Sequence, residues 1–296
     1  MTLSHLPEQR QRFFINHSPI RGDIVHLNDA YHTIINKKNY PKALQALLGE
    51  MLVAASLLIG TLKIEGRLSI QLQSQHQDGA LAWAMAECDH TGAVRALADY
   101  HDDGSWEFCQ SSQDAFAQLG MAQGVLFINI APAQGQAYQG IVERVSDDLG
   151  ACLAHYQKQS AQIPTLLSLA SNEHGASGIL VQLLPQTADE KDLDPDLWDR
   201  LTMLTKTLKK EELLTLPADE ILYRLYHEED VVLPQPHALH FGCTCSVQKS
   251  QSAILQLGLT EALAMADNAG GHIALDCGFC GTVYDFDKAH IEHLFA

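Results

Sequence analysis

Four cysteines near the C-terminal end of the sequence are the residues most able to do chemistry. They form a CxC pair, Cys243 and Cys245, and, after 31 intervening residues, a CxxC pair, Cys277 and Cys280. Two closely spaced thiol pairs supply one tetrahedral set of sulfur ligands, which is the set that zinc prefers. We therefore predict that these four cysteines bind one zinc ion per chain.

The segments around the two pairs must position the sulfur atoms. Residues two apart on an extended backbone point to the same face, so the CxC pair can present both thiols together. The CxxC pair fits a tight metal-binding turn, in which we expect Gly278 and Gly281 to adopt positive φ. That turn follows Ile273–Leu275 and leads into Thr282–Tyr284, a pattern that predicts a β-hairpin.

The spacing alone leaves several uses of such a site open. The site is either an inert zinc centre that holds a small fold, or a thiol switch that zinc keeps poised. A thiol-disulfide oxidoreductase needs its CxxC pair at a helix N-terminus beside a thioredoxin-like sheet, which the expected hairpin does not provide. A zinc ribbon that binds nucleic acid or a transcription partner is a further alternative. Hydrolytic zinc catalysis is disfavoured, because a sulfur-only site has no open position for water.

The composition indicates an aqueous, reducing compartment. The 296 residues carry a formal net charge of −17, from 19 basic and 36 acidic residues, which opposes binding to phosphate backbones or anionic membranes. The first residues contain no apolar run typical of a signal peptide, and the longest uncharged apolar stretch, Met51–Leu62, is too short to span a bilayer. We expect a cytoplasmic protein without nucleic-acid or membrane partners.

Residues 1–185 are predicted to form an N-terminal α/β core domain within an overall α+β fold. Pro41 precedes a long helix, because apolar residues recur at helical spacing from Ala43 to Leu58. A second helix is expected over Leu149–Tyr156. Apolar or alternating runs of strand length predict strands at Arg21–Leu27, Leu68–Gln73, Ala80–Ala86, Gly124–Ile130, Tyr138–Val142 and Gly178–Leu184.

Residues 186–233 are predicted to form a charged helical linker. Residues 189–230 hold 19 charged residues, of which 13 are acidic. Narrow apolar stripes on short charged helices are stable only when they dock against a neighbour. The linker is therefore either a solvated connector or a segment that undocks and exposes its stripe. The stripes are Leu197, Leu201, Leu204 and Leu208, followed by Ile221, Leu222, Leu225 and Tyr226.

Residues 234–296, which begin with Pro234 and Pro236, are predicted to form a small zinc-binding domain. About sixty residues bury little core, so a domain of this size usually needs a staple. Structural zinc contributes about 10–16 kcal/mol in small peptides at neutral pH. Oxidation of the thiolates would eject the metal and remove that stabilisation, and the domain would then unfold.

The three other cysteines, Cys88, Cys109 and Cys152, are scattered along the sequence. Each is expected to pack as a small buried apolar side chain. Cys152 and His155 lie three apart on an expected helix, so a catalytic Cys/His pair is a weaker alternative. No G-x-x-x-x-G-K-[ST] motif occurs, so nothing in the sequence supports ATP binding through a P-loop.

These motifs together resemble the family of redox-regulated heat-shock chaperones called the 33 kDa chaperonin. A CxC pair followed by 31 residues and a CxxC pair is specific, and the resemblance runs the whole length of the chain. The matching segments are Phe241–Ser246, Cys277–Cys280, Tyr284–Phe286, Leu47–Leu52 and Leu222–Tyr226.

The resemblance implies an ATP-independent holdase, which is a binding protein and not an enzyme. In that family the reduced, zinc-bound form is inactive. Oxidants form two disulfides, which by position are Cys243–Cys245 and Cys277–Cys280 here, and zinc is released. The zinc domain and linker then unfold, and the exposed apolar surface binds unfolding proteins, often as a homodimer. We carry these properties over as expectations for this chain.

Overall fold

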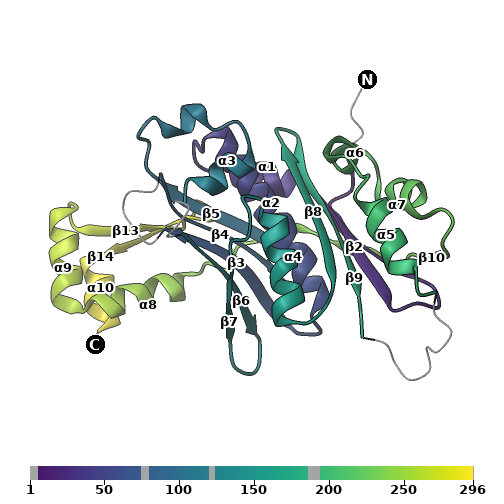
Figure 1. Cartoon of the computed structure of the whole chain (residues 1–296). Coiled ribbons are helices and arrows are strands. Elements are labelled where there is room, and N and C mark those ends of the chain that lie inside the picture. The colour runs from purple at the N-terminus through teal and green to yellow at the C-terminus, as the bar shows by residue number, and fades with distance from the viewer. Residues whose placement is uncertain (1–5, 75–79, 120–123, 186–193, 296) are drawn as a thin grey trace. The chain divides into compact units, whose positions relative to one another are not determined.

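The computed structural model of the chain describes residues 6–74, 80–119, 124–185 and 194–295 (Figure 1). The chain divides into two compact units, Met1–Phe241 and Gly242–Ala296. Residues 186–193, where we expected the linker to begin, lie outside the described residues. Helices combined with mostly antiparallel sheets confirm the α+β fold class.

The first sheet of the first unit has the strand order β10–β1–β2–β9–β8, with β11 also paired to β1. Its central ladder joins β2 to β9 antiparallel. Side chains alternate between two faces along each strand, so each face of the sheet presents its own set of residues. The strands are β1 (Gln9–Ile15), β2 (Ile20–Leu27), β8 (Thr165–Asn172), β9 (Gly175–Leu183), β10 (Val231–Val232) and β11 (His237–Ala238).

The second sheet has the strand order β12–β5–β4–β3–β6–β7. Neighbouring strands pair antiparallel except β12, which runs parallel to β5. One face buries apolar side chains such as Leu68, Ile70 and Leu72 in the main core. The strands are β3 (Gly66–Ser74), β4 (Leu81–Asp89), β5 (Ala93–Tyr100), β6 (Gly124–Pro132), β7 (Tyr138–Val142) and β12 (His240–Phe241).

Helix α2 (Lys42–Thr61) is the centre of the main core and packs against strands of both sheets. Among the described residues, α2 is the one helix long and apolar enough to cross a membrane, but 89% of its apolar window is buried inside the protein. It is therefore a core helix, as its spacing of apolar residues predicted. The shorter elements around it are α1 (Asp29–Ile35), the 3-10 turn η1 (Ser105–Phe108), α3 (Ser112–Ala117) and α4 (Leu149–Ser160).

Three arginines of the first sheet, Arg10, Arg12 and Arg21, close the C-terminal end of α2. Each donates a hydrogen bond to a backbone carbonyl within residues 56–61. The last four carbonyls of a helix lack intrahelical partners and carry partial negative charge, and the guanidinium groups of Arg12 and Arg21 satisfy both needs at Gly60 and Thr61. The buried carboxylate of Asp23 accepts two bonds from Arg12, at 3.1 and 2.9 Å. One face of the first sheet is thereby fastened to the core helix.

The opposite face of the first sheet is covered by three linker helices (Figure 1). They are α5 (Leu197–Thr205), α6 (Lys210–Thr215) and α7 (Ala218–Tyr226). The rings of Phe13 on β1 and Tyr226 on α7 lie 5.9 Å apart. We call the whole contact the linker cluster. Its buried members are Phe13, Ile15, Ile20, Ile24, Ala170, Ile179 and Val181 from the sheet, and Leu197, Leu201, Leu213, Ala218, Ile221, Leu222, Leu225 and Tyr226 from the helices.

The four leucines of the predicted stripe all belong to this contact. Leu197 and Leu201 are buried, while Leu204 and Leu208 are partly buried against the same cluster. Helix α5 ends at Thr205, so Leu208 lies beyond the helix that the spacing suggested. The division of the chain into domains at residues 185 and 233 stays a prediction. In this structure the described linker residues pack with the first unit.

The second unit has a small core built around a two-stranded sheet. Its buried apolar residues are Ile254, Ala262, Ala266, Ile273, Phe286 and Ile291. Two of these are alanines, so apolar burial provides little stability to a unit of this length. The elements are α8 (Val247–Leu257), α9 (Leu259–Asn268), β13 (His272–Asp276), β14 (Val283–Asp287) and α10 (Lys288–Leu294).

The docking of the linker can be tested with a matched pair of substitutions on α5. Leu201 is fully buried and Met203 is 66% exposed. We expect Leu201→Glu to lower the free energy of linker opening by about 3 kcal/mol, because it removes a packed side chain and buries a carboxylate. Met203→Glu should change it by less than about 0.5 kcal/mol. Hydrogen exchange of the α5–α7 amides measures both, and equal protection in the two variants would contradict the packing.

Candidate metal centre

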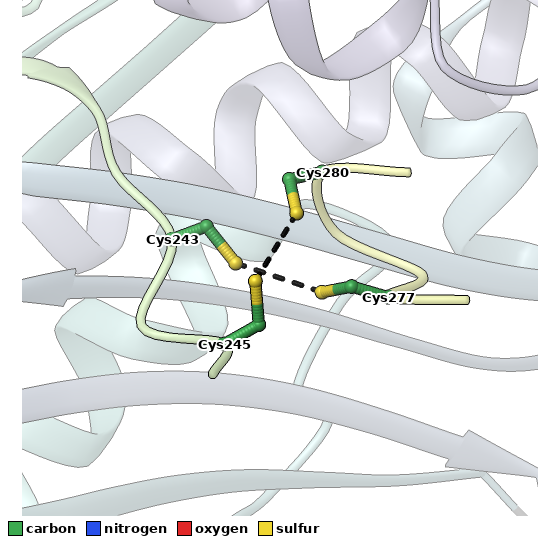
Figure 2. A group of neighbouring side chains, drawn as sticks. All are labelled: Cys243, Cys245, Cys277 and Cys280. Atoms are coloured by element: carbon green, nitrogen blue, oxygen red, sulfur yellow. Dashed lines mark hydrogen bonds between the residues drawn. The ribbon is translucent and has the colours of Figure 1, made fainter. Parts of the chain in front are cut away.

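The four cysteines of the predicted zinc site come from two segments of the second unit. Cys243 and Cys245 lie in the segment between β12 and α8, while Cys277 and Cys280 lie in the turn between β13 and β14. Figure 2 shows the four side chains pointing toward one another from these two segments. The fold therefore brings together all four residues that the sequence singled out.

The CxxC turn is a hairpin loop, as predicted, and is closed by its own backbone. The N–H of Cys277 donates to the carbonyl of Thr282 at 2.9 Å, and the N–H of Gly281 donates to the carbonyl of Cys277 at 2.7 Å. Gly281 adopts φ +72°, which explains a glycine there. The same expectation for Gly278 was wrong, because Gly278 is not in the positive-φ region.

The sulfur positions fit a tetrahedral metal ion. All four Sγ atoms lie within 4.8 Å of one another. Cys243 Sγ lies 3.6 Å from Cys277 Sγ, and Cys245 Sγ lies 3.3 Å from Cys280 Sγ. A tetrahedron with metal–sulfur bonds of about 2.3 Å separates its sulfurs by about 3.8 Å. The cluster is thus able to bind one metal ion, and its four cysteines are in the reduced state.

Two neighbours bond directly to the sulfur atoms. The Tyr284 hydroxyl on β14 donates to Cys245 Sγ at 3.1 Å, and Cys280 Sγ lies 3.1 Å from the hydroxyl of Thr282. Groups that hydrogen-bond to metal ligands orient them and tune their basicity. The sequence reasoning placed both residues in the hairpin but assigned them no role at the sulfurs. Alternation along β14 is the signal that could have directed Tyr284 toward the cysteines.

The CxC segment is held by the start of α8. Ser246 caps this helix by accepting the N–H of Lys249 at 3.3 Å. The ammonium group of Lys249 reaches back to the carbonyl and hydroxyl of Thr244, at 2.6 and 3.1 Å. These bonds fasten the backbone between Cys243 and Cys245 to the first turn of α8.

The thiols of the cluster differ in acidity. Burial raises the pKa of Cys243 to about 12. Burial acts in the same direction on Cys280, but hydrogen bonds from the side chain and backbone of Thr282, together with the adjacent thiols, lower the pKa of Cys280 to about 6. The thiolate is both the metal ligand and the nucleophile toward oxidants, so Cys280 is more ready for either reaction than Cys243.

The other cysteines are buried, as expected, and lie in the first unit. Burial raises the pKa of Cys88 to about 12, and burial likewise raises the pKa of Cys109. Cys152 Sγ donates to the carbonyl of Ser146, while His155 faces the carboxylate of Glu143. The alternative of a Cys152/His155 catalytic pair is therefore not supported by the contacts of either residue.

Comparison with known proteins identifies the family. A family model described as Hsp33 protein matches residues 8–287, a span that includes both cysteine pairs. The chain belongs to the Hsp33 family. Its relatives include the 33 kDa chaperonin of Pseudomonas aeruginosa, 40% identical over 298 residues and covering 99% of this chain and 96% of that protein. The 33 kDa chaperonin of Yersinia pestis is 38% identical over 296 residues, with the same coverage.

The crystal structure of the Thermotoga maritima 33 kDa chaperonin, described as a heat shock protein 33 homolog, has the same fold. It aligns with a TM-score of 0.80 over 97% of each chain at 20% sequence identity. Hsp33 proteins are non-enzymatic holdase chaperones, so the expectation of a chaperone is confirmed and the oxidoreductase alternative is wrong. The chain is thus a chaperone of the Hsp33 family with a four-cysteine cluster able to bind a metal.

The first prediction for this centre concerns its metal content. Protein purified under reducing conditions should contain one metal ion per chain, and Cys277→Ser combined with Cys280→Ser should abolish retention, because two of four ligands are lost. Cys109→Ser is the matched control, since Cys109 lies in the first unit. Metal analysis after gel filtration is the measurement. Full retention by the double variant would show that the metal lies elsewhere.

The second prediction concerns the bond from Tyr284 to Cys245. Tyr284→Phe keeps the ring and removes only the hydroxyl that donates to the sulfur. Loss of such a supporting bond weakens metal binding by about 10-fold or more in other sites, and we expect a similar loss here. Competition with a chromogenic chelator measures the affinity. Unchanged affinity would mean that the hydroxyl does not support the ligand.

Proposed function

We propose that the chain is a redox-regulated, ATP-independent holdase whose client-binding surface is the face of the first sheet beneath α5–α7. The observation that carries this proposal is the linker cluster. It joins an apolar sheet face to three short helices in a highly charged segment. Such helices depend on docking for their stability, so the cover can leave without unfolding the core.

Zinc is the metal we propose for the cluster. Four sulfur donors in a tetrahedral arrangement are typical of structural zinc, and they leave no open position for a reacting water. When bound, zinc would link the CxC segment to the CxxC hairpin and keep all four sulfurs as thiolates. The small core of the second unit supports this role, because it lacks the apolar burial to hold the two segments together.

Oxidation of the thiolates is the proposed signal. The expected disulfides are Cys243–Cys245 and Cys277–Cys280, each within one pair. Forming each S–S bond removes two electrons from two thiolates. With hypochlorous acid as oxidant, these electrons and one proton yield chloride and water. Both disulfides together use all four sulfurs, so the unit loses its metal ligands and with them its main source of stability.

The chain itself connects this event to the linker. Helix α7 ends at Tyr226, and residues 227–242 lead from it to Cys243. This segment is held by three strands of two residues each, β10 and β11 on β1 and β12 on β5. Strands this short add few hydrogen bonds. We propose that unfolding of the second unit detaches this segment from β1 and β5, and that α5–α7 are then released.

Release would uncover an apolar surface suited to unfolding proteins. It would expose the sheet side of the linker cluster, including Phe13, Ile24 and Ile179. Exposed segments of unfolding clients are apolar, so the recognition needs no sequence motif and no nucleotide. We propose a homodimer as the active form and the cytoplasm as the compartment, because the thiols must be reduced before the signal arrives.

A client aggregation assay tests this function. Reduced, metal-loaded protein should fail to suppress aggregation of a thermally unfolding client, and protein treated with hypochlorous acid should suppress it. Mass spectrometry of the oxidised protein should find the two disulfides within the CxC and CxxC pairs. Suppression by the reduced protein equal to that of the oxidised protein would overturn the redox switch.

The linker variants separate a switch from an inert zinc site. Leu201→Glu should suppress client aggregation while reduced and still metal-bound, because it opens the linker cluster without touching the cysteines. Met203→Glu should behave like the unmodified chain. If Leu201→Glu opens the linker by hydrogen exchange but stays inactive until oxidised, the sheet face under α5–α7 is not the client-binding surface.

A further inference from the structure

A histidine lies on the sheet face that the linker helices cover. His26 is on β2, on the same face as Ile20 and Ile24 of the linker cluster, and is 3% exposed. Its ring lies close to the backbone carbonyls of Leu213 and Leu216, in and just after α6. Among the described residues, its buried Nε2 atom has no hydrogen-bond partner. His26 therefore contacts the linker directly and has one nitrogen that can accept a proton.

A cavity of about 210 Å³ adjoins this ring, between the first sheet and α6. Its lining includes Ser177 on β9, with Leu214 and Thr215 on α6. Two further histidines, His32 and His174, also line it, and no carboxylate does. A proton added at His26 would thus meet no carboxylate among the described residues that line the cavity.

The charged groups on the neighbouring elements are engaged elsewhere. On α6, Lys210 lies 3.8 Å from the carboxylate of Glu50 on α2, and Glu212 pairs with Arg224. Before β1, the Glu8 carboxylate accepts the backbone N–H groups of residues 28 and 30, at 2.6 and 2.8 Å. The remaining charged residue of α6, Glu211, is exposed. A buried imidazolium at His26 would therefore lack a counter-ion within the part of the chain that the structure describes, which is strongly unfavourable.

We propose that His26 couples linker docking to pH, because it is neutral while α6 is docked and its protonation expels α6 from the sheet. This inference rests on the proposed function, in which α5–α7 cover the client-binding face. At acidic pH, less oxidant would then be needed to activate the chaperone.

The direction of the pH effect follows from the pKa of His26 in the docked and in the open state of the linker. Burial lowers the pKa of His26 from its ordinary 6.5 to about 4 while the linker is docked, although the carbonyl bonds act the other way. In the open state the ring meets water and regains its ordinary pKa. The docked state binds this proton less tightly than the open state. Above pH 6.5 the ring is neutral in both states and docking is not penalised, whereas between pH 6.5 and 4 protonation of the open state makes docking progressively less favourable. At pH 5.5 the opening constant should be about tenfold higher from this residue alone.

Glu50 has the opposite effect on the pH dependence of linker docking, so its contribution must be separated from that of His26. Burial raises the pKa of Glu50 to about 7, although Lys210 of the linker and the Ser112 hydroxyl lower it. If opening α6 hydrates Glu50, its pKa falls, so acid favours the docked state through this group. The test is therefore made in a Glu50→Gln background, where His26 is the variable residue.

The experiment compares two reduced, metal-loaded full-length proteins, Glu50→Gln and Glu50→Gln combined with His26→Gln. Glutamine keeps an N–H donor for the α6 carbonyls but does not titrate. Hydrogen exchange of the α6 amides, corrected for the intrinsic rate, gives the opening constant at pH 7.5 and 5.5. Metal content is measured at both pH values, so that loss of zinc is not mistaken for linker opening.

We expect the ratio of the two opening constants to rise about tenfold from pH 7.5 to 5.5, in favour of the protein that keeps His26. A ratio that does not change with pH would overturn the proposal. NMR titration of the His26 ring in the unmodified chain is independent of any variant. A midpoint below about 5 supports the proposal, and one near 6.5 overturns it. Either failure leaves oxidant-driven opening untouched, so it is distinguishable from failure of the proposed function.

Discussion

The face of the first sheet opposite α2 carries apolar side chains, whose exposure to water would be unfavourable. Three helices of nine, six and nine residues cover this outer face. Helices of this length are not stable alone, so each depends on the sheet as much as the sheet depends on it. The inner face differs, because it packs on a 20-residue core helix and is fastened to it by Arg10, Arg12 and Arg21. One face of the sheet is thus fastened to the core, and the other carries short helices that we propose can leave it.

The charge of the linker does not hold it in place. Its ion pairs, such as Arg200 with Asp194 and Glu229, lie largely at the surface, where such pairs contribute little. Cohesion comes instead from apolar burial and from the hydroxyl bond between Thr205 on α5 and Tyr226 on α7. In the proposed open state, the acidic residues would keep the released segment soluble and extended. This combination suits a cover that leaves and returns.

Sequence patterns predicted the parts with strong, local signals. The core helix, the four cysteines, the hairpin at the CxxC pair and the apolar residues of α7 were all found in this way. Strand β1 was missed because its polar run Gln9–Arg12 hides the alternation that places Phe13 inward. Strand β5 was missed because Ala93–Tyr100 includes several alanines and charged residues, which are uncommon in strands.

Side-chain contacts between segments that are far apart in the chain could not be predicted from the sequence patterns. The spacing could indicate only on which face of β14 Tyr284 lies, and not that its hydroxyl would donate to Cys245, since that contact depends on how the hairpin meets the CxC segment. Nor did it indicate that His26 would lie beneath α6, because β2 and the linker are far apart along the chain. The family assignment came from motifs, whereas these contacts come from packing.

The central claim is that metal loss at the cysteines opens the linker while the core stays folded. Stepwise oxidation of the full-length protein, with metal release and hydrogen exchange followed in the same sample, tests it most directly. The α5–α7 amides should lose protection in proportion to the metal released, while those of β3 and β6 remain protected. Linker amides that stay protected after all metal has left would contradict it.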